Sequence, residues 1–229
     1  MKKKLLFLYM AIILFSCKKD DTVVDLGYNY FPESVGTFVI YDVDSFVYND
    51  FTHTIDTFTF QVKEIIESVY KDNANRNTLR LERYYRGDAS QDWLLQDVWV
   101  ANKTVNRAEK VEENQRFVKL IFPTKKGMVW NGNASNTNGE QNYIYTDVDV
   151  KRTINNLSFD STLLVTQLAD SNLIEKKISV EMYAKNVGMI YKHFASVKDN
   201  DAVIDFSKSF NERIDSGFDY YYRIHSYGK

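Results

Sequence analysis

The 229-residue chain has few of the residues on which metalloenzymes and disulfide-bonded proteins depend. It contains one cysteine and three histidines, His53, His193 and His225. A single cysteine forms neither an internal disulfide nor a multi-thiolate metal site, and three scattered histidines leave little for zinc chemistry. The Gly-x-Ser-x-Gly motif of serine hydrolases does not occur. The sequence therefore predicts no enzyme activity, no metal and no cofactor.

Long apolar runs are also missing. The apolar stretch at residues 5–15 is about eleven residues long, well short of the roughly 20 that span a bilayer. Three lysines precede this stretch, and Ser16 and Cys17 follow it. A basic start, a short apolar middle and a small residue before the cleavage point are typical of a secretory signal peptide. We therefore expect residues 1–16 to be removed on export.

The quartet Leu14-Phe15-Ser16-Cys17 resembles the lipobox of bacterial lipoproteins. In that family the cysteine is acylated and becomes the first residue of the mature protein. Phe15 is bulkier than the residue usually found at its position. The resemblance implies that Cys17 is lipidated and holds the protein to a membrane. Several acyl chains would make this anchor firm, because one chain alone binds a bilayer only marginally.

The next residues, Lys18-Lys19-Asp20-Asp21, resemble the surface-export signal of Bacteroidota lipoproteins. In that signal a lysine and two acids follow shortly after the lipidated cysteine. The resemblance implies that Lys19, Asp20 and Asp21 direct the protein to the outer membrane, facing the cell exterior. The alternative is that this charged run is a solvated tether.

The charge balance of the mature chain is mildly acidic. Removing the leader takes away three lysines and leaves 26 basic against 31 acidic side chains, a net charge of −5. Nucleic-acid binding depends on a basic surface that neutralises phosphates. We therefore expect no nucleic-acid partner, and contact with the membrane only through the lipid anchor.

Period-two alternation of apolar and polar residues dominates the rest of the chain, which predicts β-strands with one solvated face. The expected strands lie at 39–47, 54–66, near 79–81, and at 93–105, 116–122, 143–150, 159–167, 177–185, 187–197 and 217–227. Within 177–185, we expect Ile178, Val180, Met182 and Ala184 to face the core. Short helices are expected at 168–177 and 207–215.

Neither a repeat nor a break in composition divides the chain, so we expect a lipidated tether at 17–30 and a single β domain at 31–229. About ten strands are more than a flat sheet tolerates comfortably. The sequence therefore predicts an all-β fold: one strongly curved antiparallel sheet, or an open or half barrel, with minor helices.

Three segments of the mature chain resemble a family of Bacteroidota outer-membrane lipoproteins of unknown activity. They are the opening run Tyr30–Gly36, the string Tyr183–Lys192 and the closing residues 216–228. These are turn and strand motifs. The resemblance implies an all-β lipoprotein and brings no catalytic residue.

Trp130, Asn131 and Asn133 form the most distinctive local string. A tryptophan beside an asparagine-rich loop is able to stack on a sugar while the amides hydrogen-bond to it. The structural alternative is that Trp130 plugs one end of the curled sheet while the loop turns. We name these three residues as candidate ligand contacts and favour the plug.

Pairs of carboxylates two residues apart occur twice, at Asp42 and Asp44 and at Asp147 and Asp149. Such pairs serve acid–base chemistry in glycosidases or bind calcium, but they also occur on ordinary solvated strand faces. The acidic run 199–205 lacks the glycine and distal glutamate of an EF-hand loop, so a turn explains it. We favour the structural interpretation of all these residues.

Two functions are consistent with these observations. The first is a binding or accessory module of the outer envelope, which presents loops or a concave aromatic face to a glycan, protein or other envelope partner. The second is a carrier that holds a lipid or other hydrophobic ligand in a cavity of the curved sheet. An interior filled by side chains would favour the first. An enzyme would require paired acids in a cleft.

Overall fold

The computed structural model describes residues 24–201 and 203–229, so Cys17, Lys19, Asp20 and Asp21 lie outside the described residues. The strands in chain order are β1 (Phe38–Asn49), β2 (Thr54–Lys71), β3 (Asn77–Arg86), β4 (Leu94–Lys103), β5 (Arg107–Glu112), β6 (Gln115–Ile121), β7 (Val129–Asn131), β8 (Asn142–Ile154), β9 (Leu157–Ser171), β10 (Glu175–Ala184), β11 (Gly188–Lys198) and β12 (Ser216–Gly228). Within residues 24–201 and 203–229 there are also two short 3-10 helices, η2 (Tyr28–Tyr30) and η3 (Phe210–Glu212). In the described part, no helix has the length and apolar character needed to cross a membrane. The predicted all-β fold is confirmed.

All the strands belong to one antiparallel sheet with the order β6-β5-β4-β3-β2-β1-β12-β11-β10-β9-β8-β7. Strands β1–β6 follow one another as a meander, and so do β7–β12. The two meanders meet at the centre of the sheet, where β1 pairs with β12, from Phe38 opposite Gly228 to Tyr48 opposite Gly217. The first and last strands of the chain are therefore neighbours.

The described residues differ from the sequence-based prediction in four elements, of which β7 is too short for alternation to show. Strand β5 was not predicted, because its sequence Arg-Ala-Glu-Lys-Val-Glu is mostly charged. The helix predicted at 168–177 is wrong: these residues end β9, turn and begin β10, with the Asn172 side chain accepting from the backbone of Ile174 and Glu175. Only the single turn η3 forms within 207–215.

The two edges of the sheet, β6 and β7, meet and close it into a barrel. The backbone N–H of Val118 donates to the carbonyl of Gly132 over 2.8 Å, and the Trp130 indole N–H donates to the carbonyl of Val118 over 2.8 Å. The Tyr145 hydroxyl donates to the carbonyl of Ile121 and accepts from its N–H, both at 2.7 Å. Side chains thus replace most of a backbone ladder at this seam.

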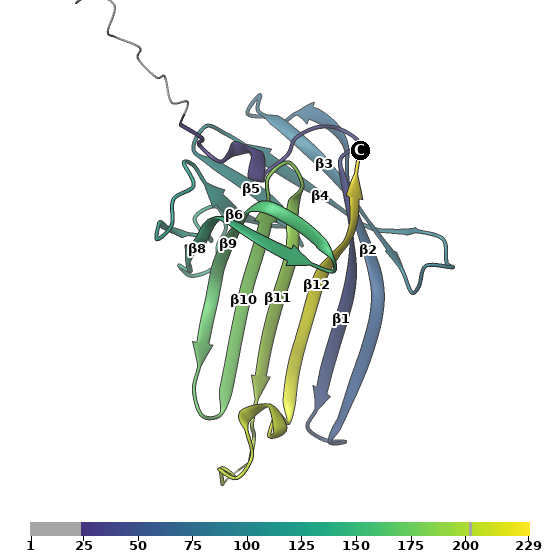
Figure 1. Ribbon diagram of the computed structural model, residues 1–229, viewed down its shortest axis with the longest axis vertical. Helices are drawn as coiled ribbons and strands as arrows, with labels where there is room; N and C mark the ends of the chain where they lie inside the picture. Colours follow the sequence, from purple (N-terminus) through teal and green to yellow (C-terminus); the bar gives the residue numbers. More distant parts are fainter. Residues whose placement is uncertain (1–23, 202) are drawn as a thin grey trace, which may run out of the picture.

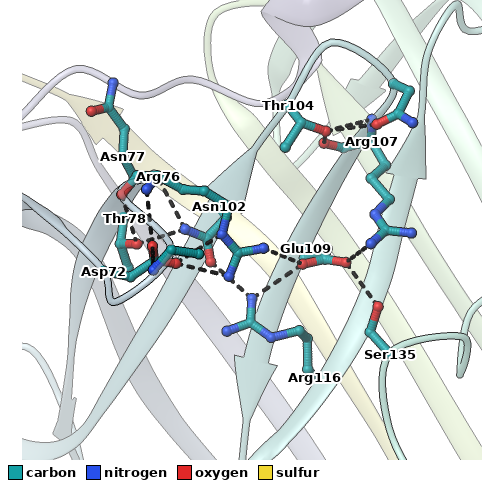
Figure 2. Close-up of polar contacts among 12 residues, drawn as sticks. Asp72, Arg76, Asn77, Thr78, Asn102, Thr104, Arg107, Glu109, Arg116 and Ser135 are labelled. Carbon is teal, nitrogen blue, oxygen red and sulfur yellow. Dashed lines mark hydrogen bonds and ion pairs between the residues drawn. The ribbon is translucent and has the colours of Figure 1, made fainter.

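A polar cluster on β5 and β6 ties the β7–β8 loop across the seam (Figure 2). Glu109, whose side chain is 4% exposed, lies 2.9 Å from Arg107 and 3.2 Å from Arg116. The Arg76 guanidinium lies 3.9 Å from Glu109, and the hydroxyl of Ser135 donates to Glu109 from the loop over 2.8 Å. The Asn136 side chain donates to the backbone carbonyl of Arg116. Because Glu109 is buried, these partners stabilise its charge and fix the loop.

The segment at residues 25–36 closes one end of the barrel. Tyr30 is fully buried in the main apolar cluster with Leu120, Tyr145 and Leu163. The Lys103 ammonium donates to the carbonyls of Tyr28 and Phe31 at 3.1 and 2.8 Å. The first described residues therefore lie at the closed end (Figure 1).

Strand β10 presents to the barrel interior the face that the sequence assigned to the outside. Glu181 and Tyr183 point inward, and Glu181 pairs with Lys119 of β6. Met182 and Ala184 instead belong to a second apolar cluster with residues of the β8–β9 hairpin, such as Phe159, which crosses in front of the sheet in Figure 1. The prediction that Ile178, Val180, Met182 and Ala184 face inward was wrong, because an ion-pair network occupies the interior there and the hairpin covers the outer face.

Candidate ligand-binding site

The end of the barrel opposite the N-terminal segment is open on one side. Figure 1 shows β1, β2 and β10–β12 continuing well past the short strands β3–β6. Antiparallel register carries the interior face onto this extension: Val43 lies opposite Phe60 and Tyr222, and Ser45 lies opposite Phe58 and Tyr220. The extension is therefore a concave surface that leads into the barrel.

This concave surface is lined by aromatic side chains, and we call it the aromatic shelf. Its residues are Phe58, Phe60, Phe194, Phe218, Tyr220 and Tyr222. Phe194 stacks between Phe218 and Tyr220, with ring centroids 5.5 and 5.2 Å apart and planes within 17° of parallel. Such stacking holds the rings in place without other support. Phe58 and Phe218 remain 54% and 41% exposed, so the shelf offers apolar area to a ligand.

Where the shelf enters the barrel, charged side chains of alternating sign form a continuous chain across the interior. We call this series the ion chain. Its members in order are Asp97, Arg83, Glu64, Lys110, Glu112, Lys119, Glu181 and Lys192. The tightest links of the outer part are Arg83 to Asp97 at 3.0 Å and Lys110 to Glu64 at 2.8 Å. With four bases and four acids, the ion chain is neutral.

The inner half of the ion chain is held ionised by its own members. Burial opposes the charge on Glu112, but the ammonium groups of Lys119, Lys192 and Lys110 outweigh it and lower the pKa of Glu112 to about 2. Burial likewise opposes the charge on Glu181, and Lys119 and Lys192 still lower its pKa. In turn the carboxylates raise the pKa of Lys119 and of Lys192 against burial. The interior is thus a set of fixed charges near neutral pH.

A pocket of about 410 Å³ lies at this entrance, which we call the barrel mouth. Its walls combine ion-chain residues with Trp99, Phe117, Tyr220 and Tyr222. The Arg83 guanidinium lies 3.7 Å from the centre of the Trp99 ring, which fixes both groups. The volume and the mixture of aromatic walls with a few polar groups fall in the range of small-molecule sites.

Deeper in the barrel, side chains fill most of the space. The cavity between the mouth and the closed end has a volume of about 70 Å³. This is less than half of the roughly 150 Å³ of an apolar cavity that admits benzene. A cavity of this volume leaves little room for an acyl chain.

The three candidate ligand contacts of the sequence have internal partners. Trp130 is 8% exposed and packs on Tyr145, with ring centroids 4.5 Å apart, as part of the seam. The Asn131 side chain accepts from the backbone N–H groups of Asn133 and Gln141, and the Asn133 amide donates to a loop carbonyl. These bonds explain the string through the fold. A ligand role for it stays a prediction.

The paired carboxylates of the sequence have cationic or hydrogen-bonding partners, and neither pair brings its two acids together in a cleft. Asp42 and Asp44 lie on the outer face of β1, and Asp147 and Asp149 on the bulged strand β8. Their partners are Gln61 and His225 for Asp42, Arg223 for Asp44, Lys126 and Arg152 for Asp147, and Tyr30, Ser161 and Lys185 for Asp149. This geometry provides no acid–base pair.

In the acidic run 199–205, Asp199 forms a buried ion pair with Arg213. Asp199, Asp201 and Asp215 each bring one oxygen within 4.8 Å of the others. The guanidinium already supplies positive charge there, so the ion pair explains the cluster.

Sequence reasoning missed the ion chain. Its members come from β2, β3, β4, β5, β6, β10 and β11, and each charge taken alone resembles a residue on a solvated strand face. The available signal was in β10, where Glu181 and Tyr183 alternate with apolar residues. Such a pattern predicts two faces and does not say which of them is inside.

Comparison with known proteins gives little to add. No protein-family model matches the chain, and no curated protein sequence does. One similar solved structure is a candidate exported protein with a YmcC-like fold from Bacteroides fragilis, 10% identical, covering 87% of this chain and 98% of that chain, with a TM-score of 0.40. Another is a candidate lipoprotein from Parabacteroides distasonis, 9% identical, with the same coverage and a TM-score of 0.31. Similarity this weak supports no functional conclusion.

Proposed function

We propose that this protein is a lipid-anchored protein of the outer envelope that binds a neutral glycan at the barrel mouth. The anchor is proposed from the signal peptide and from the lipobox ending at Cys17. The binding role is proposed from one observation: the exposed aromatic shelf is continuous with a pocket of about 410 Å³ lined by the ion chain.

The neutrality of the ion chain favours an uncharged ligand. Arg83, Lys110 and Lys192 are each already near a carboxylate, so an anionic or cationic ligand would have to displace a partner. Displacing a partner leaves a partly buried charge uncompensated, which is costly. Hydroxyl groups both donate and accept, so they bond to a carboxylate and an ammonium at once. Sugar C–H groups meanwhile pack on the rings of the shelf.

Carriage of a lipid inside the barrel is the alternative, and the size of the cavity argues against it. The cavity of about 70 Å³ inside the barrel leaves little room for an acyl chain. A fatty acid would have to lie on the exposed shelf, where most of its length would stay in water.

The position of the proposed anchor favours binding of a ligand from the cell exterior at the barrel mouth. Cys17 precedes the first described residue by seven positions, and the first described segment lies at the closed end of the barrel (Figure 1). At about 3.5 Å per residue, such a tether holds the closed end within a few tens of ångströms of the membrane. The mouth then faces away from the membrane.

Isothermal titration of the purified mature protein with a panel of neutral oligosaccharides tests the proposal. We expect one member of the panel to bind, and Trp99→Ala and Tyr220→Ala each to weaken its affinity about tenfold or more. Tyr70→Ala is the matched control, because Tyr70 is an exposed aromatic residue outside the mouth. Uptake of a fluorescent fatty acid with no glycan binding would contradict the proposal.

A further inference from the structure

The loops at the end of the molecule opposite the N-terminal segment expose large apolar side chains. The exposed fractions are 94% for Phe51, 57% for Ile55, 61% for Leu173, 48% for Ile174, 81% for Val203 and 76% for Phe206. Ile55 lies at the start of β2, and the others come from the β1–β2 turn, the β9–β10 turn and the β11–β12 loop. Single exposed apolar residues are ordinary, but several on neighbouring loops mark an interaction site.

These three loops form one surface. The backbone N–H of Asp199 donates to the carbonyl of Ile174 over 2.9 Å, and the Arg213 guanidinium donates to the carbonyl of Leu173 over 3.3 Å. On the other side, a carboxylate oxygen of Asp215 lies within 4.8 Å of ligand atoms of Asp50 and His53. The β11–β12 loop thus bridges the two turns. We call this surface the loop end.

The loop end is strongly acidic. Residues 50–53, 172–174 and 199–215 contain six carboxylates against one lysine and one arginine. The carboxylates are Asp50, Asp199, Asp201, Asp205, Glu212 and Asp215. Asp199 is buried and paired with Arg213, so the other five form the acidic rim. Such a rim repels the anionic headgroups of a membrane, and it equally repels a second copy of itself. It attracts a surface of opposite charge.

We propose that the loop end is a docking surface for a protein partner whose contact area has apolar pockets bordered by lysine and arginine. Apolar side chains such as Phe51, Leu173 and Phe206 enter the pockets and supply the affinity, while the carboxylates set orientation and speed association. The loop end lies far from the segment that leads to Cys17, so the partner approaches from the side away from the anchor (Figure 1). This surface is separate from the barrel mouth.

The single native cysteine allows a sharp test. Phe51→Cys and Phe206→Cys each place one thiol on the loop end, and Val105→Cys places one in the β4–β5 turn at the closed end, where Val105 is 81% exposed. The full-length protein, expressed in its own host, is treated with a maleimide–succinimidyl cross-linker, whose second arm reacts with lysine. Intact cells and isolated outer membranes are compared, so that a failure of surface display is distinguished from a failure of docking. The unsubstituted protein reports any background from Cys17.

We expect Phe51→Cys and Phe206→Cys to give an adduct with one common protein, and Val105→Cys to give none. Adding Leu173→Ser and Val203→Ser should reduce the adduct yield about tenfold. Adding Asp201→Asn and Asp205→Asn, or about 0.5 M salt, should reduce it about threefold. The cross-linked peptide should be rich in lysine and arginine. The substituted residues are exposed, so melting temperatures should match that of the parent protein.

Three results would overturn the proposal. The first is equal labelling at Val105 and at the loop end. The second is an adduct of twice the mass of the chain, which would identify a second copy as the occupant. The third is no protein adduct together with flotation of the protein on phosphatidylethanolamine vesicles that Phe51→Ser abolishes, which would identify a lipid surface.

Discussion

Lys119 and Glu181 form the most deeply buried contact of the ion chain, with side chains 5% and 1% exposed. Lys119→Met would leave Glu181 in the interior with its main partner missing. We expect a loss of about 3–5 kcal/mol in the free energy of unfolding, the usual cost of breaking a buried ion pair on one side. Urea denaturation followed by circular dichroism measures this loss.

Lys151→Met is the matched control, because Lys151 pairs with Asp160 on the surface, where both side chains are largely exposed. Exposed pairs of this kind contribute little. The control should unfold at the same urea concentration as the parent protein. An equal effect of the two substitutions would show that the ion chain is not a structural feature of the interior.

The pKa of Glu112 determines how the protein responds to acid. Its folded-state pKa of about 2 is below the ordinary value of 4.5. A carboxyl with a lowered pKa contributes stability above its unfolded pKa and loses it as the pH falls through the folded pKa. We therefore expect the free energy of unfolding to fall between about pH 4.5 and pH 2.

Glu112→Gln should be less stable than the parent protein at pH 7, and the difference between the two should narrow as the pH is lowered through that window. Urea denaturation at a series of pH values gives both curves. If the free energies of unfolding of the two proteins changed in parallel with pH, the lowered pKa of Glu112 would be contradicted.

At the residue scale, the sequence predicts a role that depends on neighbours in the chain, but not one that depends on partners brought together by the fold. Cys17 is informative because its neighbours in the chain carry the signal. Glu64, Lys110 and Glu181 are distant in sequence and become neighbours only when the sheet curls. Their role depends on curvature, which single-sequence patterns do not encode.

At the scale of elements, Gly217 opens β12 where that strand runs close to β11. Its φ is +114°, and a Cβ there would lie 2.0 Å from the carbonyl oxygen of Ser196 and 2.8 Å from the Cα of Val197. Both obstacles are backbone atoms, so they cannot rotate away. We expect Gly217→Ala to lower the free energy of unfolding by about 2 kcal/mol or more. Thermal unfolding measures this.

Gly139→Ala is the control for that substitution. A Cβ at Gly139 meets nothing within 4 Å, so this variant should melt at the parent temperature. A matching loss at both positions would point to a general effect of losing glycine and not to the approach of β12 to β11.

Trp130 separates the two roles that its sequence suggests. Its indole N–H donates to Val118 across the seam and its ring packs on Tyr145. Trp130→Phe should cost about 1–3 kcal/mol, because the buried carbonyl loses its donor. Glycan affinity measured by titration should stay unchanged. A stable variant with lost affinity would instead support a sugar platform at Trp130.

Elements with clear alternation were predictable, and elements whose pattern is interrupted were not. Strand β2 was expected at 54–66 and continues to Lys71 beyond a bulge near Ile66 and Ser68. A bulge shifts the side-chain alternation, so the pattern ends before the strand does. Strand β7 has only three residues, too few for a period to show.

At the scale of the whole molecule, we expect the proposed anchor and the barrel to behave as independent units. Cys17→Ala should abolish acyl labelling and release the protein from the membrane fraction, while its melting temperature stays that of the parent. Replacing Lys19, Asp20 and Asp21 with alanine should preserve acylation but remove accessibility to external protease. Membrane fractionation and protease digestion of intact cells measure these outcomes. A Cys17→Ala protein that resists extraction with high salt would contradict the anchor.

The pairing of β1 with β12 determines when folding of the chain can be completed. A polypeptide emerging N-terminus first can form its hairpins one by one, but β1 keeps an open edge until the thirteen residues of β12 arrive. Contacts between the two ends of a chain close the largest possible loop, so they form late and slowly. For a chain exported as we propose, complete assembly therefore waits until β12 has cleared the translocation machinery. A sheet with its final strand at the centre is suited to a protein that crosses a membrane unfolded and matures only on the far side.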